Sequence, residues 1–251
     1  MEVIVGSSRC RRIVEILADG SKDKEAHLFT RGEISSISGM FIPGGKFAKV
    51  TEAAVDIVNK LRPHRELWPV VVYMVCGMTD STTRIVDFYD RVKYEEVICT
   101  EAPTTTAHRV IQEIEASAQD LVRAGAIPVF ATTAPMSFSD WNHWCLNKGK
   151  RTSHLLHFKQ YAEMQELHNA AIANINSHIV ARNSYNGVAT PHLGSQILSK
   201  RGQGLSYRFR HNRLRDGCHP DIPTTHKWVE EMISVININR LALGPTITVN
   251  W

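Results

Sequence analysis

The chain lacks most of the features that would place it outside the ordinary globular proteins. Its 251 residues include five cysteines, an odd number with no CxxC spacing, which argues against a disulfide framework and against a zinc ribbon. The longest apolar run, residues 67–78, is interrupted by Pro69 and falls short of the roughly 20 residues of a membrane helix. With 43% hydrophobic and 22% charged residues, the composition also excludes disordered and collagen-like classes.

The N-terminus has no basic region followed by an apolar stretch and a small-residue cleavage site, so a signal peptide is not indicated. We therefore expect an intracellular protein, cytoplasmic or nuclear, with reduced cysteines. The chain opens directly on residues 2–5, which have the pattern of a core strand, and we expect it to be a domain of a longer polypeptide. No repeat, low-complexity linker or composition break divides it, so we predict one domain over residues 1–251.

One segment of the chain has several basic residues and no acidic residue. The whole chain carries a formal charge of +4, but residues 200–215 contain six lysines or arginines and no acidic residue. Such a run is usually a solvated loop. The other interpretation is a surface that binds nucleic acid or another polyanion.

Short apolar runs alternate with helical patterns along the chain. The predicted strands cover residues 2–5, 34–42, 69–76 and 127–131. The predicted helices cover residues 47–61, 107–124, 158–180 and 224–243. Residues 81–101 and 184–215 do not fit the alternation, and we predict insertions or long loops there. This order predicts a three-layer α/β/α sandwich with a central, mostly parallel, flavodoxin-like sheet.

Ligands of such sheets bind beyond the carboxyl ends of the strands, so the residues just after each predicted strand are the first candidates. Ser7 and Ser8 follow Gly6 after the first strand, where a hydroxyl at a sharp turn could act as a nucleophile or simply cap a helix. Gly44 and Gly45 follow the second strand, and residues 77–80, Gly-Met-Thr-Asp, follow the third. Tight turns would explain each of these alone.

Asp216 and His219 stand three residues apart, just before the last predicted helix. Hydrolysis through a serine needs an imidazole that accepts the hydroxyl proton and a carboxylate that orients the imidazole. One short loop could supply both groups. A lone DxxH is frequent by chance and carries little weight by itself.

In their order along the chain, these four pieces resemble the four blocks of the SGNH (GDSL-type) hydrolases, over nearly the whole length. The resemblance implies that Ser8 is the nucleophile, His219 the general base and Asp216 the orienting acid. It also implies an oxyanion hole made by Ser8, Gly44 and Thr79. Two departures stand out: Ser7 replaces the aspartate of GDS, and Thr79 replaces the asparagine of GxND. Loss of one oxyanion donor costs about 10²–10³ in rate.

Two further stretches, residues 134–142 and 214–220, resemble SGNH-like domains encoded by transposable elements and viruses. The resemblance therefore adds a transposable-element or viral reading frame as the expected source of the parent polypeptide.

The leading hypothesis is a serine esterase or acylhydrolase that acts on a small-molecule or lipid ester, with no cofactor and no metal. Further side chains are expected at the substrate rim: Ser7, Asp80, Arg208, Arg210 and Arg213. The alternative is a weak or inactive SGNH scaffold that binds nucleic acid or an anionic surface through residues 200–215.

A metal enzyme is the remaining class, because four soft ligands cluster in sequence: His143, Cys145, His154 and His157. No HExxH or paired CxxC supports it. Cys218 lies between the proposed acid and base, and we predict a buried packing residue there rather than a nucleophile.

Overall fold

The computed structural model describes residues 1–17, 27–30, 36–61, 69–89, 92–148, 156–200 and 207–243. Its main sheet has the strand order β2-β3-β1-β4-β7. The strands are β1 (Glu2–Ser7), β2 (His27–Thr30), β3 (Ser36–Ile42), β4 (Val70–Val75) and β7 (Ala126–Phe130). Neighbours among β3, β1, β4 and β7 pair in parallel, and β2 pairs with β3 in the antiparallel sense.

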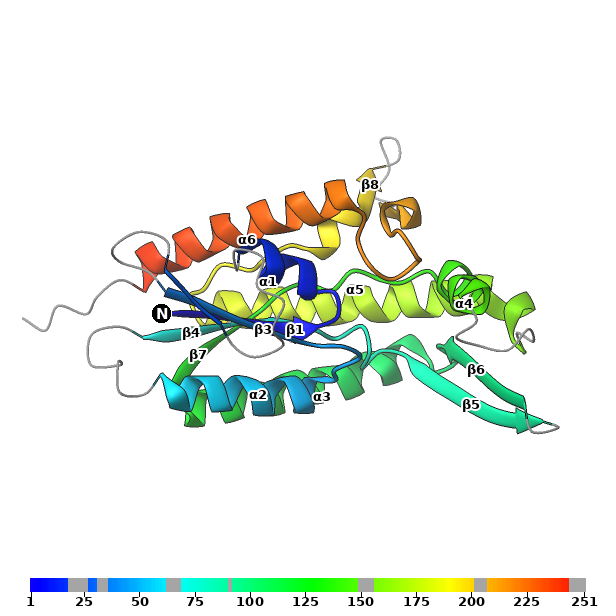
Figure 1. The fold of residues 1–251 in the computed structure, drawn as a ribbon, viewed down its shortest axis with the longest axis horizontal. Coiled ribbons are helices and arrows are strands. Elements are labelled where there is room, and N and C mark those ends of the chain that lie inside the picture. The colour runs from blue at the N-terminus through cyan, green and yellow to red at the C-terminus, as the bar shows by residue number, and fades with distance from the viewer. Residues whose placement is uncertain are drawn as a thin grey trace, which may run out of the picture.

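Helices cover both faces of this sheet (Figure 1). They are α1 (Arg11–Leu17), α2 (Phe47–Lys60), α3 (Pro103–Arg123), α4 (Phe138–Asn147), α5 (Tyr161–Tyr185) and α6 (Ile222–Ala242). The parallel strands follow the chain order 2-1-3-4, as in flavodoxin-like sheets. The predicted three-layer α/β/α fold with a mostly parallel sheet is confirmed.

Alternation along the buried strands divides the core between the two faces. Val3 and Val5 of β1 pack with α2, α3 and α5, whereas Ile4 packs with α1 and α6. Each central strand is buried on both sides, so it appears in the sequence as a continuous apolar run. This pattern is why β1 and β4 could be predicted.

Local signals fix the last helix. The Asp221 side chain accepts a hydrogen bond from the Thr224 backbone N–H at 2.8 Å, and Pro223 lies in the first turn, where its missing N–H costs nothing. In the described part of the chain no helix combines the length and apolar character that crossing a membrane requires.

Two segments predicted as loops contain regular structure. Residues 81–101 hold an antiparallel hairpin of β5 (Thr83–Tyr89) and β6 (Val92–Ile98). This hairpin projects from the body of the fold beside α4 (Figure 1). Residues 184–215 hold the short pair β8 (Leu198–Lys200) and β9 (Tyr207–Phe209), with 3-10 turns at Gly194–Ile197 and His211–Arg213. A third 3-10 turn, Phe158–Gln160, precedes α5.

Polar side chains of the helices hold the segment that follows β7. Asn183 bonds both backbone groups of Phe130, and Asn176 bonds both backbone groups of Thr133. Gln165 donates to the Met136 carbonyl at 2.7 Å. Among the described residues no strand pairs with the outer side of this segment. The side-chain amides of α5 therefore satisfy its backbone groups and fix its path beyond the carboxyl end of β7.

Candidate active site

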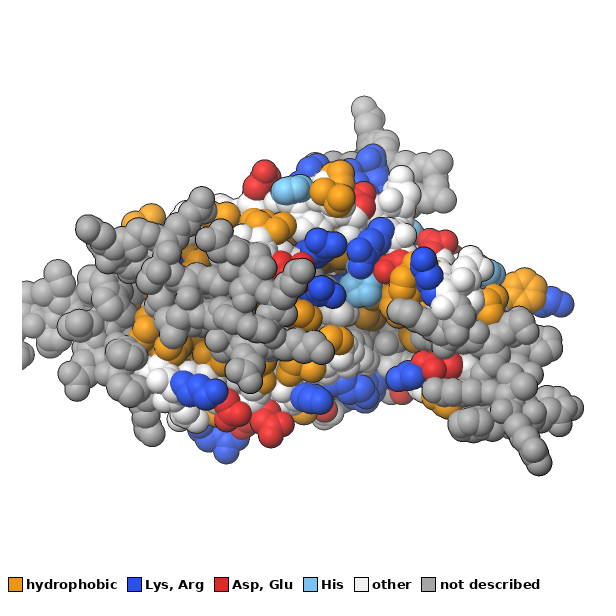
Figure 2. Space-filling model, viewed as in Figure 1, with side chains coloured by type: hydrophobic (Ala, Val, Ile, Leu, Met, Phe, Trp, Pro, Cys, Tyr) orange, Lys and Arg blue, Asp and Glu red, His pale blue; other side chains and the backbone are white. Residues whose placement is uncertain are grey.

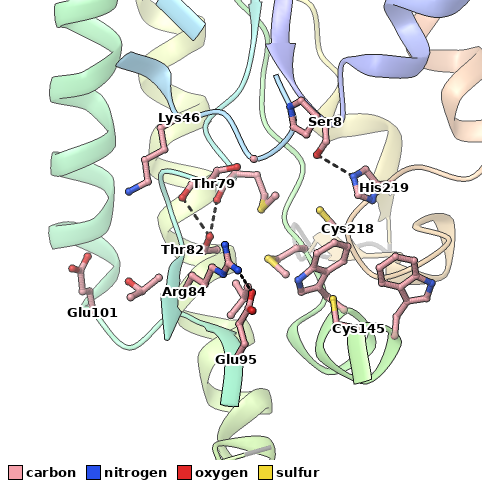
Figure 3. Close-up of a pocket in the computed structure, with 18 of the residues that line it drawn as sticks. Ser8, Lys46, Thr79, Thr82, Arg84, Glu95, Glu101, Cys145, Cys218 and His219 are labelled. Carbon is pink, nitrogen blue, oxygen red and sulfur yellow. Dashed lines mark hydrogen bonds and ion pairs between the residues drawn. The ribbon is translucent and has the colours of Figure 1, made fainter. Parts of the chain in front are cut away.

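The carboxyl ends of the parallel strands meet one cavity of about 820 Å³. Ser8 after β1, Gly44 after β3 and Thr79 after β4 all line it, together with His219 from the loop before α6. Figure 3 shows the side chains of Ser8, Thr79 and His219 around the cavity. Residues far apart in the sequence are thus brought together at the edge where ligands of such sheets bind.

The end of β1, just before the turn that carries Ser8, has room for glycine alone at position 6. A Cβ there would lie 2.3 Å from the Val75 carbonyl oxygen and 2.6 Å from Cys10 Cβ. The turn is closed by a hydrogen bond from Cys10 N–H to the Ser7 carbonyl at 2.9 Å. This close approach of β1 to β4 brings the chain out of the sheet at Ser8, whose side chain is partly exposed to the cavity.

The loop before α6 folds back on its own carboxylate. One oxygen of Asp216 accepts hydrogen bonds from the backbone N–H of Cys218 at 3.0 Å and of His219 at 2.7 Å. Gly217 has φ +79°, and a Cβ there would lie 2.6 Å from the Trp141 backbone nitrogen. Its carbonyl accepts from the Ser137 N–H at 2.7 Å, which ties the loop to the start of α4.

Asp216, His219 and Ser8 form a continuous chain of hydrogen bonds. The second Asp216 oxygen lies 2.8 Å from His219 Nδ1, and His219 Nε2 lies 3.0 Å from Ser8 Oγ. An ionised carboxylate only accepts, so Nδ1 carries the proton and Nε2 is left free to accept the Ser8 hydroxyl proton. The structure thus brings together the three residues predicted as the triad.

The Asp216 carboxyl is stabilised as an anion. Burial raises its pKa, but hydrogen bonds from the His219 ring and from the His219 and Cys218 N–H groups outweigh burial and hold the pKa below its usual range. Asp216 therefore stays charged at neutral pH, where it can fix the His219 tautomer and stabilise an imidazolium.

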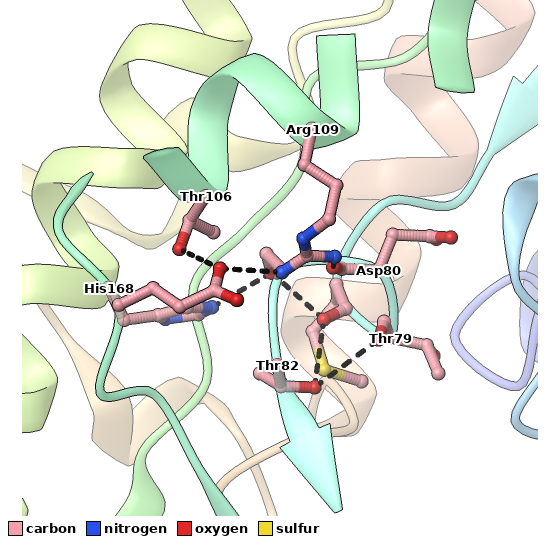
Figure 4. A network of polar contacts seen from close by, with 9 residues as sticks. Thr79, Asp80, Thr82, Thr106, Arg109 and His168 are labelled. Carbon is pink, nitrogen blue, oxygen red and sulfur yellow. Dashed lines mark hydrogen bonds and ion pairs between the residues drawn. The ribbon is translucent and has the colours of Figure 1, made fainter. Parts of the chain in front are cut away.

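The predicted oxyanion residues surround the same cavity. Gly44 has φ +66° in a turn closed by the Gly45 N–H to the Ile42 carbonyl at 2.9 Å. Thr79 lies in the turn that follows Gly77, and the Thr82 hydroxyl lies 3.2 Å from the Met78 carbonyl and 3.5 Å from the Thr79 carbonyl (Figure 4). Thr79 thus lies in a turn that internal hydrogen bonds hold.

Arg109 of α3 joins this turn to Glu101. It donates to the Asp80 carbonyl at 2.6 Å and to Glu101 at 2.9 Å, and Thr106 donates to the same Glu101 oxygen at 3.0 Å. Figure 4 shows Asp80, Thr106 and Arg109 in this network. The hydrogen bonds from Arg109 and Thr106 lower the pKa of Glu101, against a small opposing effect of burial. Glu101 is therefore a fixed anion that anchors Arg109 beneath the turn.

Ser7 and Asp80 were predicted to lie at the rim of the substrate site, but both are buried below the cavity. Ser7 is buried in β1, because the strand that carries it runs through the middle of the sheet. Asp80 is 3% exposed and accepts a hydrogen bond from the Phe47 N–H at 3.0 Å, so it caps the start of α2. Burial raises its pKa to about 6, partly offset by the Phe47 N–H and by Lys46.

Two of the arginines predicted at the rim, Arg210 and Arg213, are not among the described residues that line the cavity. Arg208 belongs to β9, and its side chain lies outside the described part of the structure. Arg210 is exposed, and Arg213 donates to the Gln196 carbonyl. Of the described side chains in this segment, Arg215 comes near the proposed triad, with its Nε 3.7 Å from Asp216 Oδ2.

Two walls of the cavity were not predicted from the sequence. One is the base of the β5–β6 hairpin, where Arg84 and Glu95 form an ion pair across the strands. The other is α4, which contributes Trp141 and Trp144, stacked with ring centroids 5.3 Å apart. Asn142 joins the walls by bonding both backbone groups of Val97, at 2.8 and 3.0 Å. The signal for α4 was present in Ser137, which caps it through the Asp140 N–H.

The role of a buried arginine was not predicted from the sequence either. Arg9, directly after Ser8, is almost fully buried and donates to the carbonyls of Ala134 and Pro135. It thereby ties the turn that carries Ser8 to the segment after β7. Its cation partly offsets the rise that burial causes in the pKa of Cys218. Cys218 is buried, as predicted, and all five cysteines are free.

A second serine and histidine pair lies below the cavity. Ser81 Oγ is 3.0 Å from His168 Nε2, and it donates to the Met78 carbonyl at 2.8 Å. Burial lowers the pKa of His168 to about 3, so its ring is neutral. Both side chains are buried, and the Ser81 proton already has an acceptor, so this pair supports the turn and cannot attack a substrate.

Three of the four residues considered as metal ligands are described, and they have separate surroundings. His143 bonds the Ser139 carbonyl, His157 bonds Glu96, and Cys145 lines the cavity. His154 lies outside the described residues. Within the described ranges no three His, Cys, Asp or Glu side chains could hold one metal ion.

No protein-family model and no curated protein sequence matches this chain. Among solved structures, a Bacteroides fragilis protein assigned as an acylhydrolase superposes with a TM-score of 0.53 at 15% identity, covering 96% of this chain and 87% of the other. A GDSL-like lipase from Bacteroides thetaiotaomicron gives 0.52 at 13% identity, covering 96% and 88%. The OSK domain of Drosophila Oskar gives 0.49 at 11% identity, covering 93% and 86%. The two Bacteroides structures show that the chain has the SGNH (GDSL-type) hydrolase fold.

Proposed function

We propose that this protein is a serine esterase or acylhydrolase that uses Ser8, His219 and Asp216. The observation that carries the proposal is the unbroken chain of hydrogen bonds from a buried carboxylate, through one imidazole, to a serine hydroxyl that faces a cavity. The activities assigned to the two Bacteroides proteins agree with it.

The proposed reaction begins when Ser8 Oγ attacks the acyl carbon of an ester. His219 Nε2 takes the hydroxyl proton as the new C–O bond forms, and the carbonyl electron pair moves to oxygen. When the tetrahedral intermediate collapses, the alcohol leaves with the proton from Nε2. Water then attacks the acyl-enzyme in the same way and releases the carboxylic acid and Ser8.

Charge develops on the carbonyl oxygen during both steps. The backbone N–H groups of Ser8 and Gly44 and the Thr79 hydroxyl are the proposed donors to it. Thr79 brings one proton on a shorter side chain than the asparagine of the family pattern. We therefore expect modest turnover numbers on unactivated esters.

The test is hydrolysis of short 4-nitrophenyl esters by the wild-type protein and by Ser8→Ala. We expect turnover by the wild type and a loss of at least about 10³-fold in kcat for the variant. Ser177→Ala is the matched control, because Ser177 is an exposed serine of α5 that bonds only within its helix, to the Ala173 carbonyl. Equal activity of Ser8→Ala and the wild type would contradict the proposal.

A second candidate function is the binding of a polyanion. Figure 2 shows lysine and arginine side chains gathered around a histidine near the middle of one face. Arg210 and Arg215 beside the proposed triad are exposed, as are Arg11 and Arg12 of α1. If this face binds nucleic acid, the affinity should fall steeply with salt. The absence of binding at low salt would exclude it.

A further inference from the structure

One cation in the cavity has no partner. Lys46 lines the cavity between Gly44 and the first turn of α2, and within the described structure its ammonium group makes no hydrogen bond or ion pair. Figure 3 shows Lys46 on the opposite side of Thr79 from His219. The Lys46 residue is exposed, and a positive charge that lines a partly enclosed site attracts an anionic group of a ligand.

The other cations that line the cavity are engaged within the protein. Arg84 is paired with Glu95 across the hairpin. Arg109 is bound to Glu101 at 2.9 Å and to the Asp80 carbonyl at 2.6 Å. The two glutamates thus pair with the two arginines, whereas Lys46 forms no ion pair with the described residues.

The N-terminus of α2 does not offer a second group for an anion, and Asp80 does not form an ion pair with Lys46. The Phe47 N–H at the start of the helix already donates to Asp80, so it is not available to a ligand. The Asp80 carboxyl is buried below the turn, and no ion pair joins it to Lys46. Its negative charge weakens the field of Lys46 but leaves the ammonium group itself open to a ligand.

The opposite wall of the cavity is apolar. It consists of aromatic, methionine and aliphatic side chains from α4 and its neighbours: Met78, Val97, Met136, Trp141 and Trp144. The Trp141 ring also packs against His219, with centroids 5.6 Å apart. Ser8 and His219 therefore lie beside an apolar wall, with a lone cation across the cavity.

From this arrangement we infer that the preferred substrate is an anionic ester. Its carboxylate or other negative group pairs with Lys46, and its apolar part lies against the apolar wall that contains Trp141. The inference rests on the proposed esterase function and specifies its substrate class. Lys46 then determines specificity rather than taking part in bond cleavage, so its effect should appear in KM more than in kcat.

The experiment compares two pairs of esters that differ in one charge. The first pair, 4-nitrophenyl hydrogen adipate and 4-nitrophenyl hexanoate, places the charge on the acyl group. The second, 4-acetoxybenzoate and its methyl ester, places it on the leaving group. The pair that responds identifies which side of the scissile bond faces Lys46. Each is measured with the wild type, Lys46→Gln and Lys46→Glu.

We expect the wild type to prefer the anionic member of one pair in kcat/KM. Because Lys46 is exposed, Lys46→Gln should lower that preference about two- to fivefold, through KM, and Lys46→Glu should lower it further. The matched control is Lys49→Gln, on the next turn of α2, which is exposed and does not line the cavity; it should keep the wild-type preference.

The outcomes separate this inference from the function on which it rests. If the wild type hydrolyses the esters but Lys46→Gln and Lys49→Gln show the same preference, the anionic substrate is wrong and the esterase stands. An absence of preference in the wild type has the same meaning. If the wild type hydrolyses none of the four esters, both fall.

Discussion

Asp80 offers a test of the electrostatics below the cavity. The side chain is 3% exposed, one oxygen accepts the Phe47 N–H, and the other has no hydrogen-bond partner among the described residues. Burial raises its pKa from 3.8 to about 6. The substitution Asp80→Asn removes the charge and keeps an oxygen that can accept from Phe47, so it isolates the cost of burying the carboxylate.

The sign and size of the effect follow from the shift. Because the pKa in the folded state lies above the unfolded value, the protonated group contributes stability that is complete below about pH 4 and is lost as the pH rises through about 6. At 1.36 kcal/mol per unit, the wild-type carboxylate should cost about 2–3 kcal/mol of unfolding free energy between pH 4 and pH 8. Asp80→Asn should not show this loss.

The measurement is urea unfolding of both proteins across this pH range. The unfolding free energy of Asp80→Asn minus that of the wild type should rise by about 2–3 kcal/mol from pH 4 to pH 8. Any constant cost of the new amide cancels in this comparison. Asp56→Asn, an exposed position on α2, serves as the control and should give a flat difference. A flat difference for Asp80→Asn would refute the reasoning.

Two further substitutions test the proposed triad and its support. Asp216→Asn can keep both backbone hydrogen bonds but presents an amide to His219 Nδ1. In an ester assay kcat should therefore fall by about 10³–10⁴, while the melting temperature changes little. An unchanged kcat would contradict the triad. Gly6→Ala drives a Cβ against the Val75 carbonyl and should cost about 1–3 kcal/mol in urea unfolding and reduce activity. In Gly187→Ala no atom lies within 4 Å of the new Cβ, but the φ of +68° strains an alanine by about 1–2 kcal/mol, so this variant should lose a similar amount of stability and keep its activity. Equal activity in the two glycine variants would contradict this account of the turn.

The sequence predicted the central sheet because its strands are buried on both faces. A buried parallel strand such as β4 appears as an apolar run, and α2 and α3 show three- and four-residue spacing that adjacent residues alone determine. The strand ends then singled out the segments that hold Ser8, Gly44 and Thr79, and the family resemblance assigned the roles of these residues.

The hairpin could not be predicted in the same way, because long-range contacts stabilise it. Glu96 of β6 is buried and bonds His157 and Tyr161, and Val97 is held by Asn142. These partners lie at least 45 residues away. The pairing of Arg84 and the isolation of Lys46 likewise depend on which side chains the fold brings to the cavity.

Three predictions rest on the sequence alone. They are the single domain over residues 1–251, the parent polypeptide from a transposable element or virus, and the intracellular location. They stay predictions.

The most direct test of the central claim is covalent labelling of Ser8. The folded protein is treated with a fluorophosphonate, and the modified peptide is identified by mass spectrometry. The proposed triad predicts one adduct per chain, on Ser8, absent from Ser8→Ala and strongly slowed in His219→Ala. No adduct on the folded wild-type protein, or an adduct on another residue that persists in Ser8→Ala, would contradict the claim.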